Sequence, residues 1–394
     1  MKKLFSAIAA LSIIGTAITA MEIEPAALAA SGNRFGFDLF HELTAKGLDK
    51  NVFVSPHSVS AALTMTWGGA KGRTARDMAK TLRFKRPTVN GIYRASESLR
   101  NSLTSDTAVT LAIANSLWLR QGLIFKPEYL NKTKKSFGAE LAALDFDDPK
   151  SASVINGWVK RNTRDKIEKI VDRIGPDMAL YLINAVYFKA RWLHQFDPAQ
   201  TRERDFFLPD GATKKQPLMR RGGEFQYLKG SDFQAVYLPY AGGRMGMYVF
   251  LPDRKNGIGD FLAKLSDSNW KQWSSQFSKR KGELALPRFK AEYEKELSLS
   301  LMKLGMKIAF MDNADFSGMA KARLAISEVR HKTFLEVNEE GTEAAAVTSV
   351  SVRMTSAMPE PPPFEMIVDH PFFIAIADRE TGTILFKGAI VEPE

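Results

Sequence analysis

The chain has 394 residues, of which 45% are hydrophobic and 25% are charged, and its formal net charge is +11 at pH 7. This composition excludes an intrinsically disordered protein and predicts a substantial hydrophobic core. Cysteine is absent, which excludes disulfide bonds, thiol catalysis and thiolate metal sites.

Residues 1–29 have the pattern of a signal peptide. Two lysines precede an apolar run from Leu4 to Thr19, and small residues offer cleavage sites near Ala20 or Ala29. The alternative is an uncleaved membrane anchor, but a spanning helix needs about 20 apolar residues and this run is shorter and contains Gly15. We therefore expect residues 30–394 to form a single domain that is secreted or periplasmic and, after cleavage, has no membrane contact.

The elements expected along the chain mix helices and strands without a regular alternation. Ser55 is a plausible N-cap before Pro56, at the start of a helix that ends at Gly68. Alternating apolar residues predict strands at 109–119 and 178–190, whereas 91–103 and 158–170 have helical patterns. Short strands are expected at 225–252 and 367–391. This order predicts an α+β fold with several sheets and a helical cluster.

Patterns typical of enzymes are missing. None of the five histidines has the His-Glu-x-x-His spacing of a zinc site, and no Gly-x-Ser-x-Gly turn presents a nucleophilic serine. The glycine-rich segment 68–74 lacks the Gly-Lys-Ser/Thr ending that binds phosphates. We predict that the protein is not an enzyme and needs no metal or other cofactor. An unrelated secreted hydrolase remains the rival from another functional class.

The basic residues lie in short, scattered clusters such as Lys214–Lys215 and Arg220–Arg221. The helix expected at 91–103 carries only Arg94 and Arg100 as basic residues, so it lacks a dense basic face. We interpret the charge as a solvated basic surface, without a nucleic-acid or glycan site.

One segment near the C-terminus has an unusual composition. An acidic turn is followed by small residues, and from Thr342 to Met354 alternate residues form a face that could be buried in a strand. The segment ends in prolines, which favour exposed, extended backbone. It therefore has the properties of a loop, at about 340–363, that can become a strand. A disordered linker is the alternative from composition alone.

The sequence around this loop resembles the serpin family of serine protease inhibitors over nearly the whole chain. The matching segments are 51–60, 68–74, 184–192, 314–318, 331–332, 369–373 and 385–388. Ala190 stands where the family usually has glycine. The resemblance implies a large central mixed sheet, additional smaller sheets, a helical cluster and an exposed reactive loop.

The resemblance also implies a mechanism. A target protease would cleave the loop and form an acyl-enzyme, and the loop would then insert into the main sheet as a strand that begins at Thr342. We call the first part of the loop the hinge. It comprises Glu339, Glu340, Gly341, Thr342, Glu343, Ala344, Ala345 and Ala346.

Family spacing places the cleaved bond sixteen residues after Glu339, at Thr355–Ser356, with Met354–Thr355 as the alternative. A threonine before the bond implies an elastase-like or subtilisin-like target protease, and the protein is expected to act as a monomer. A non-inhibitory serpin, acting as a carrier or chaperone, is the rival within the family. Such a protein would typically carry bulky, charged or proline residues on the inserting face.

Five residues match family positions at which the main sheet opens. Four would form a polar cluster beneath the sheet, and Trp192 would mark the point where the loop enters; the four are Ser55, Ser58, Asn184 and His331. A satisfied core histidine and a core tryptophan are the simpler alternatives. The residues alone do not decide between these readings.

Overall fold

The computed structural model describes residues 23–342 and 361–394. Its helices are α1 (Pro25–Thr44), α2 (Pro56–Gly68), α3 (Gly72–Thr81), α4 (Val89–Thr104), α5 (Pro127–Phe137), α6 (Lys150–Asn162), α7 (Ile258–Lys264), α8 (Asp267–Ser275) and α9 (Ser298–Leu301), with short turns η1 (Pro198–Gln200), η2 (Met302–Met306) and η3 (Lys307–Phe310). In this part of the chain, no helix is both long and apolar enough to span a bilayer.

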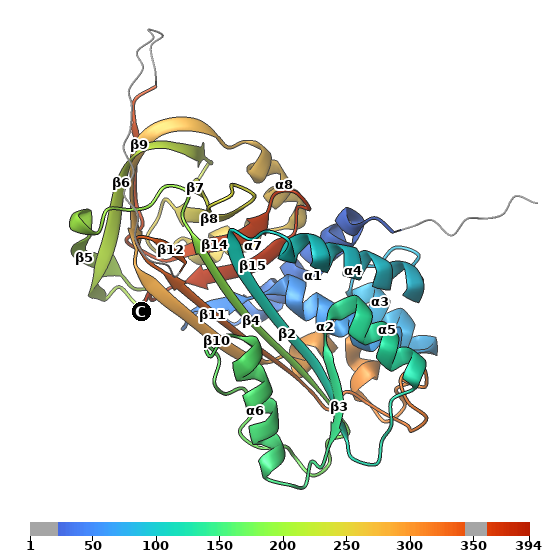
Figure 1. Cartoon of the computed structure of the whole chain (residues 1–394). Helices are drawn as coiled ribbons and strands as arrows, with labels where there is room; N and C mark the ends of the chain where they lie inside the picture. The colour runs from blue at the N-terminus through green and yellow to red at the C-terminus, as the bar shows by residue number, and fades with distance from the viewer. Residues whose placement is uncertain (1–22, 343–360) are drawn as a thin grey trace, which may run out of the picture.

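The central sheet is mixed, as expected. Its strands follow the order β10 (Phe289–Glu296), β11 (Glu328–Val337), β4 (Leu180–Arg191), β2 (Val109–Arg120) and β3 (Glu140–Leu144), and β12 (Gly341–Thr342) also pairs with β4. The β11–β4 and β2–β3 pairs are parallel, and the others are antiparallel. Figure 1 shows β2, β4, β11 and β10 side by side.

The other strands of the described chain form one continuous nine-stranded sheet. Its path is β1 (Val52–Val54), β15 (Ile384–Ile390), β14 (Phe372–Asp378), β8 (Met245–Pro252), β7 (Phe233–Pro239), β6 (Thr213–Lys229), β9 (Ser278–Pro287) and β13 (Phe364–Ile367), and β5 (Arg202–Phe207) pairs with β6. The fold is therefore α+β with mixed sheets, as predicted.

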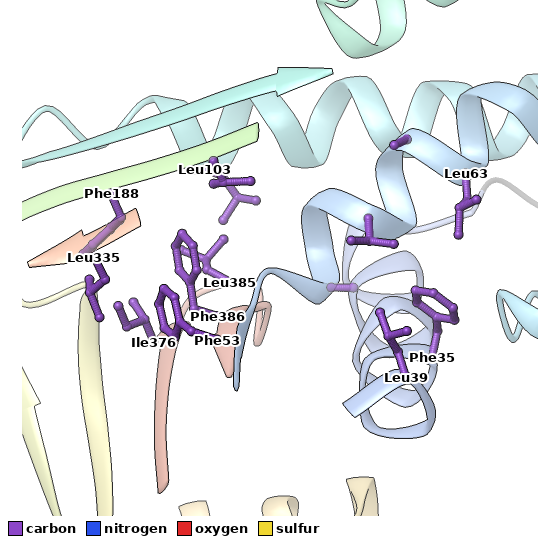
Figure 2. Close-up of a cluster of buried hydrophobic side chains, with 14 of the residues drawn as sticks. Phe35, Leu39, Phe53, Leu63, Leu103, Phe188, Leu335, Ile376, Leu385 and Phe386 are labelled. Atoms are coloured by element: carbon purple, nitrogen blue, oxygen red, sulfur yellow. The ribbon is translucent and has the colours of Figure 1, made fainter. Parts of the chain in front are cut away.

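The helical cluster and α6 cover opposite faces of the central sheet (Figure 1). Beneath the sheet, Phe53 stacks on Phe386 with ring centroids 5.1 Å apart, and Phe188 of β4 packs against the same Phe386. Figure 2 shows these rings beside Leu335 of β11. The core thus joins β1, β4, β11 and β15, so the central sheet rests on a close-packed apolar layer.

Local signals place α2 and β2 where the sequence predicts them. The Ser55 side chain accepts a hydrogen bond from the Ser58 amide at the start of α2, and Pro56 occupies the first turn. The expected strand at 109–119 is β2. The helix expected at 91–103 is α4, and the strand expected at 178–190 is β4.

The predicted helix at 158–170 is correct only for 158–162, the last residues of α6. Helix α6 ends at Asn162, and Arg164 and Asp165 have positive φ angles that break the helix. Ile167 and Ile170 are nevertheless buried in the same cluster as Ile155 and Val159. The apolar spacing therefore reflects a shared core and does not reflect a continuous helix.

Candidate functional site

The centre of the sheet contains a parallel junction between β11 and β4. β11 and β4 pair from Glu328–Tyr181 to Phe334–Tyr187. Beyond this stretch the chain turns at Asn338, and β12 runs back antiparallel to β4, with Gly341 opposite Arg191 and Thr342 opposite Ala190. The beginning of the hinge therefore pairs with the C-terminal end of β4.

Gly341 is required at this turn. Its φ is 151°, a value that residues with a side chain rarely adopt. A Cβ atom at this position would also collide with the Ala190 carbonyl oxygen and with the backbone of Arg191. The close approach of hinge and β4 thus depends on a glycine.

Thr342 is fully buried, and its Oγ1 lies 3.0 Å from the hydroxyl of Tyr240. Burial raises the pKa of Tyr240, so its hydroxyl stays protonated. The expectation that insertion after cleavage would bury Thr342 is therefore wrong for this first residue, because the uncleaved chain already holds it beside β4. The reason is the tight turn at Gly341, which brings Thr342 onto the sheet.

Trp192 directly follows the end of β4, next to the turn at Asn338. Its ring stacks on Tyr240 with centroids 4.7 Å apart, and its Nε1 donates to the Asn338 carbonyl at 2.9 Å. The Trp192 amide donates to the Glu340 carbonyl at 2.9 Å. Trp192 therefore holds both sides of the turn that begins the hinge.

Glu339 anchors the hinge from the other side. Its Oε1 accepts hydrogen bonds from Arg288 Nη2 at 2.5 Å and from Thr201 Oγ1 at 2.7 Å, and its carbonyl accepts from the Phe196 amide. Burial by itself raises the pKa of the Glu339 carboxyl, but the hydrogen bonds from Arg288 and Thr201 bring it below its ordinary value. Glu339 thus remains a carboxylate at neutral pH.

The four predicted cluster residues meet beneath the sheet. The Ser55 amide donates to His331 Nε2 at 3.1 Å, so His331 carries its proton on Nδ1, which lies 2.5 Å from Asn184 Oδ1. Asn184 Nδ2 donates to Ser58 Oγ. Burial lowers the pKa of His331 to about 3, which keeps the imidazole neutral. The network joins β4, β11 and the start of α2.

Sequence reasoning missed Asn115 as a fifth member of this polar cluster. Asn115 lies opposite Asn184 in the β2–β4 register, and its Oδ1 accepts from Asn184 Nδ2 at 2.5 Å. The signal in the sequence was Asn115 itself, a polar amide among the apolar residues of the strand expected at 109–119. Trp192 belongs to the hinge contacts and not to this cluster.

Several predicted site residues lie outside the described residues. They are Glu343, Ala344, Ala345, Ala346, Met354, Thr355 and Ser356.

Comparisons with known proteins agree with this architecture. The family model described as serpin (serine protease inhibitor) matches residues 30–393. An uncharacterized serpin-like protein of Thermococcus kodakarensis is 38% identical over 367 residues, which are 92% of this chain and 85% of the relative. Leukocyte elastase inhibitor of Sus scrofa is 36% identical over 380 residues, covering 93% of this chain and 99% of its own. The structure of human thyroxine-binding globulin in complex with thyroxine matches with a TM-score of 0.87 and 28% identity, over 94% of this chain and 99% of that one.

The chain belongs to the serpin family. Members of this family generally bind target proteases as inhibitors and are not catalysts. The similarity to a thyroxine-binding globulin shows that the same fold also serves other functions.

Proposed function

We propose that this serpin traps serine proteases by inserting its cleaved loop between β11 and β4. The observation that carries the proposal is the pairing of Gly341 and Thr342 with β4 before cleavage. Insertion would extend an existing pairing and needs no new nucleation. Cysteine proteases are a further target class that the same mechanism would serve.

The register of β12 defines where the rest of the hinge would go. Continuing this register would bring Ala344 opposite Phe188 and Ala346 opposite Val186, and both of these β4 residues belong to the core beneath the sheet. Small alanine side chains would meet the apolar layer without clashes or buried charge. Thr348 would arrive opposite Asn184, at the polar cluster.

Strand direction favours the inserted state. β11 and β4 are parallel, so a strand that runs back between them replaces one parallel pair with two antiparallel pairs, which are slightly more stable per residue. On the order of ten new hydrogen bonds at roughly 0.5–1.5 kcal/mol each would supply on the order of 10 kcal/mol. Because a whole domain is stable by only about 5–15 kcal/mol, this gain could drive the trapping of a protease.

The target protease would cleave Thr355–Ser356, or Met354–Thr355 one residue earlier, so we favour elastase-like or subtilisin-like enzymes. The protease serine would attack the backbone carbonyl and form an acyl-enzyme. Insertion would then carry the protease away before water hydrolyses the ester. We propose that the serpin does this as a monomer.

We further propose that the protein is exported and that cleavage occurs near Ala20, because α1 begins at Pro25 and Leu28 and Ala29 are buried. Cleavage near Ala29 would remove the first turn of α1 from the core. The mass of the mature protein from an exporting host distinguishes the two positions.

Incubation with elastase-, subtilisin-, chymotrypsin- and trypsin-like proteases tests the proposal. We expect a complex that survives denaturing electrophoresis, and a released C-terminal peptide that begins at Ser356. Complete cleavage of the loop by each protease without any complex would instead support a carrier or chaperone role.

A further inference from the structure

A cavity of about 510 Å³ lies beside β2, away from the hinge. Helices α1, α2 and α4 line it together with the half of β2 that has no β3 partner. Its apolar wall is formed by Leu28, Leu99, Leu111, Ile113 and Phe137. Ligand pockets in proteins typically enclose roughly 300–1,000 Å³ and have mostly apolar walls with a few polar groups.

Polar groups in the cavity wall have free hydrogen-bonding capacity. His57 and Ser60 lie one turn apart on α2, and neither side chain has a hydrogen-bond partner among residues 23–342 and 361–394. Asn115 uses its Oδ1 in the polar cluster, and within the same ranges its Nδ2 has no acceptor. Burial lowers the pKa of His57 to about 4, so its ring is neutral and offers one donor and one acceptor.

A cation lies at the edge of the same cavity. Arg100 on α4 donates to the Lys135 carbonyl and to the Asn101 side chain, both at 3.1 Å. No carboxylate in the described part of the chain pairs with it, and Glu97 on the same helix lies 3.9 Å from Lys135 instead. A guanidinium has five N–H donors, so Arg100 retains donors for a bound anion.

We infer that this cavity binds a small aliphatic carboxylic acid that also carries a hydroxyl or carbonyl oxygen at its far end. Arg100 would hold the carboxylate, and the chain would lie between Leu99 and Ile113. The far oxygen would accept from Asn115 Nδ2 and Ser60. Because Asn115 also bonds Asn184, the ligand would contact the network that joins β2 to β4. The inference does not depend on protease inhibition.

Calorimetric titration of the mature protein with ω-hydroxydecanoate tests the inference. Decanoate lacks the far oxygen and the corresponding diol lacks the carboxylate, so we expect each to bind more weakly by roughly tenfold. We expect Arg100→Gln to weaken binding of ω-hydroxydecanoate and of decanoate by roughly tenfold, and to leave binding of the diol unchanged. Ser60→Ala should affect only the two probes that carry the far hydroxyl.

Two controls keep the test decisive. Arg76→Gln removes an exposed arginine of α3 outside the cavity and should change nothing, whereas Ile113→Trp should fill the cavity and abolish binding. Thermal unfolding of each unliganded variant verifies that it is folded. Absence of binding to the wild type at millimolar probe, or equal affinity of all folded variants, would overturn the inference.

Discussion

The hydroxyl of Tyr240 and Oγ1 of Thr342 lie 3.0 Å apart beneath the end of β4, and both side chains are fully buried. Tyr240 also stacks on Trp192, which holds the turn at Asn338. The same aromatic pair therefore contacts both Thr342, the last hinge residue that the structure describes, and the turn that leads to it. Opening of the hinge requires that this hydrogen bond and these contacts are lost together.

Thr342→Val tests this hydrogen bond with almost no change of shape. Because the variant leaves the Tyr240 hydroxyl buried without a partner, we expect the free energy of unfolding to fall by about 1–3 kcal/mol. Denaturant unfolding measures it. When Tyr240 is already replaced by phenylalanine, Thr342→Val should lower the free energy of unfolding much less, because no buried hydroxyl is then left without a partner. Strictly additive effects of the two substitutions would show that the hydroxyls do not interact.

Glu339→Gln should loosen the hinge because it removes the charge that accepts from Arg288 and Thr201. Since Arg288 is about half exposed, at 49%, we expect a loss of only about 1 kcal/mol. Hydrogen exchange of the Phe196 amide, which donates to the Glu339 carbonyl, should become faster. Glu336→Gln, on the neighbouring β11, is the matched control and should leave that exchange rate unchanged. Equal exchange rates of the Phe196 amide in both variants would show that the Glu339 side chain does not anchor the hinge.

Acid should destabilise the fold through His331. Burial lowers its pKa from the ordinary value of 6.5 to about 3 in the folded state, so at pH values between these limits the unfolded chain binds the proton and the folded chain does not. The free energy of unfolding therefore decreases as the pH falls, by at most about 1.4 kcal/mol per pH unit for this group. His331→Gln should flatten the slope between roughly pH 4 and 6. If the variant and the wild type have parallel pH profiles, folding does not lower the pKa of His331.

In the proposed inserted strand, neighbouring residues point to opposite faces of the sheet. Two arginine substitutions at adjacent positions test this. Ala346→Arg would place a charge against the apolar layer next to Val186, whereas Ala345→Arg would point to the opposite face of the sheet. With the protease that forms the complex, we expect Ala346→Arg to be cleaved without trapping and Ala345→Arg to retain more of the trapping. The yield of stable complex measures both. The reverse ranking would contradict the proposed register.

Local signals were sufficient to predict part of this structure. Ser55 and Pro56 mark the start of α2 because capping depends on neighbouring residues. Alternating apolar residues mark β2, although its residues from Ala114 to Leu119 are all buried. The family resemblance supplied the cluster of Ser55, Ser58, Asn184 and His331.

The remaining features depend on contacts between distant segments. Asn115 joins the cluster only through the register of β2 on β4, and Arg288 reaches Glu339 only because β10 pairs with β11. The predicted helix was extended wrongly beyond Asn162 because residues on both sides of Arg164 and Asp165 share one core. Periodicity within one segment cannot reveal such contacts.

The most direct test of loop insertion is to cleave the loop and compare the thermal unfolding of the cleaved and intact proteins. Insertion beside β4 should raise the unfolding temperature by at least roughly 10 °C, because the added strand contributes on the order of 10 kcal/mol. An unchanged unfolding temperature after complete cleavage would show that the loop does not insert, and would contradict the proposed mechanism.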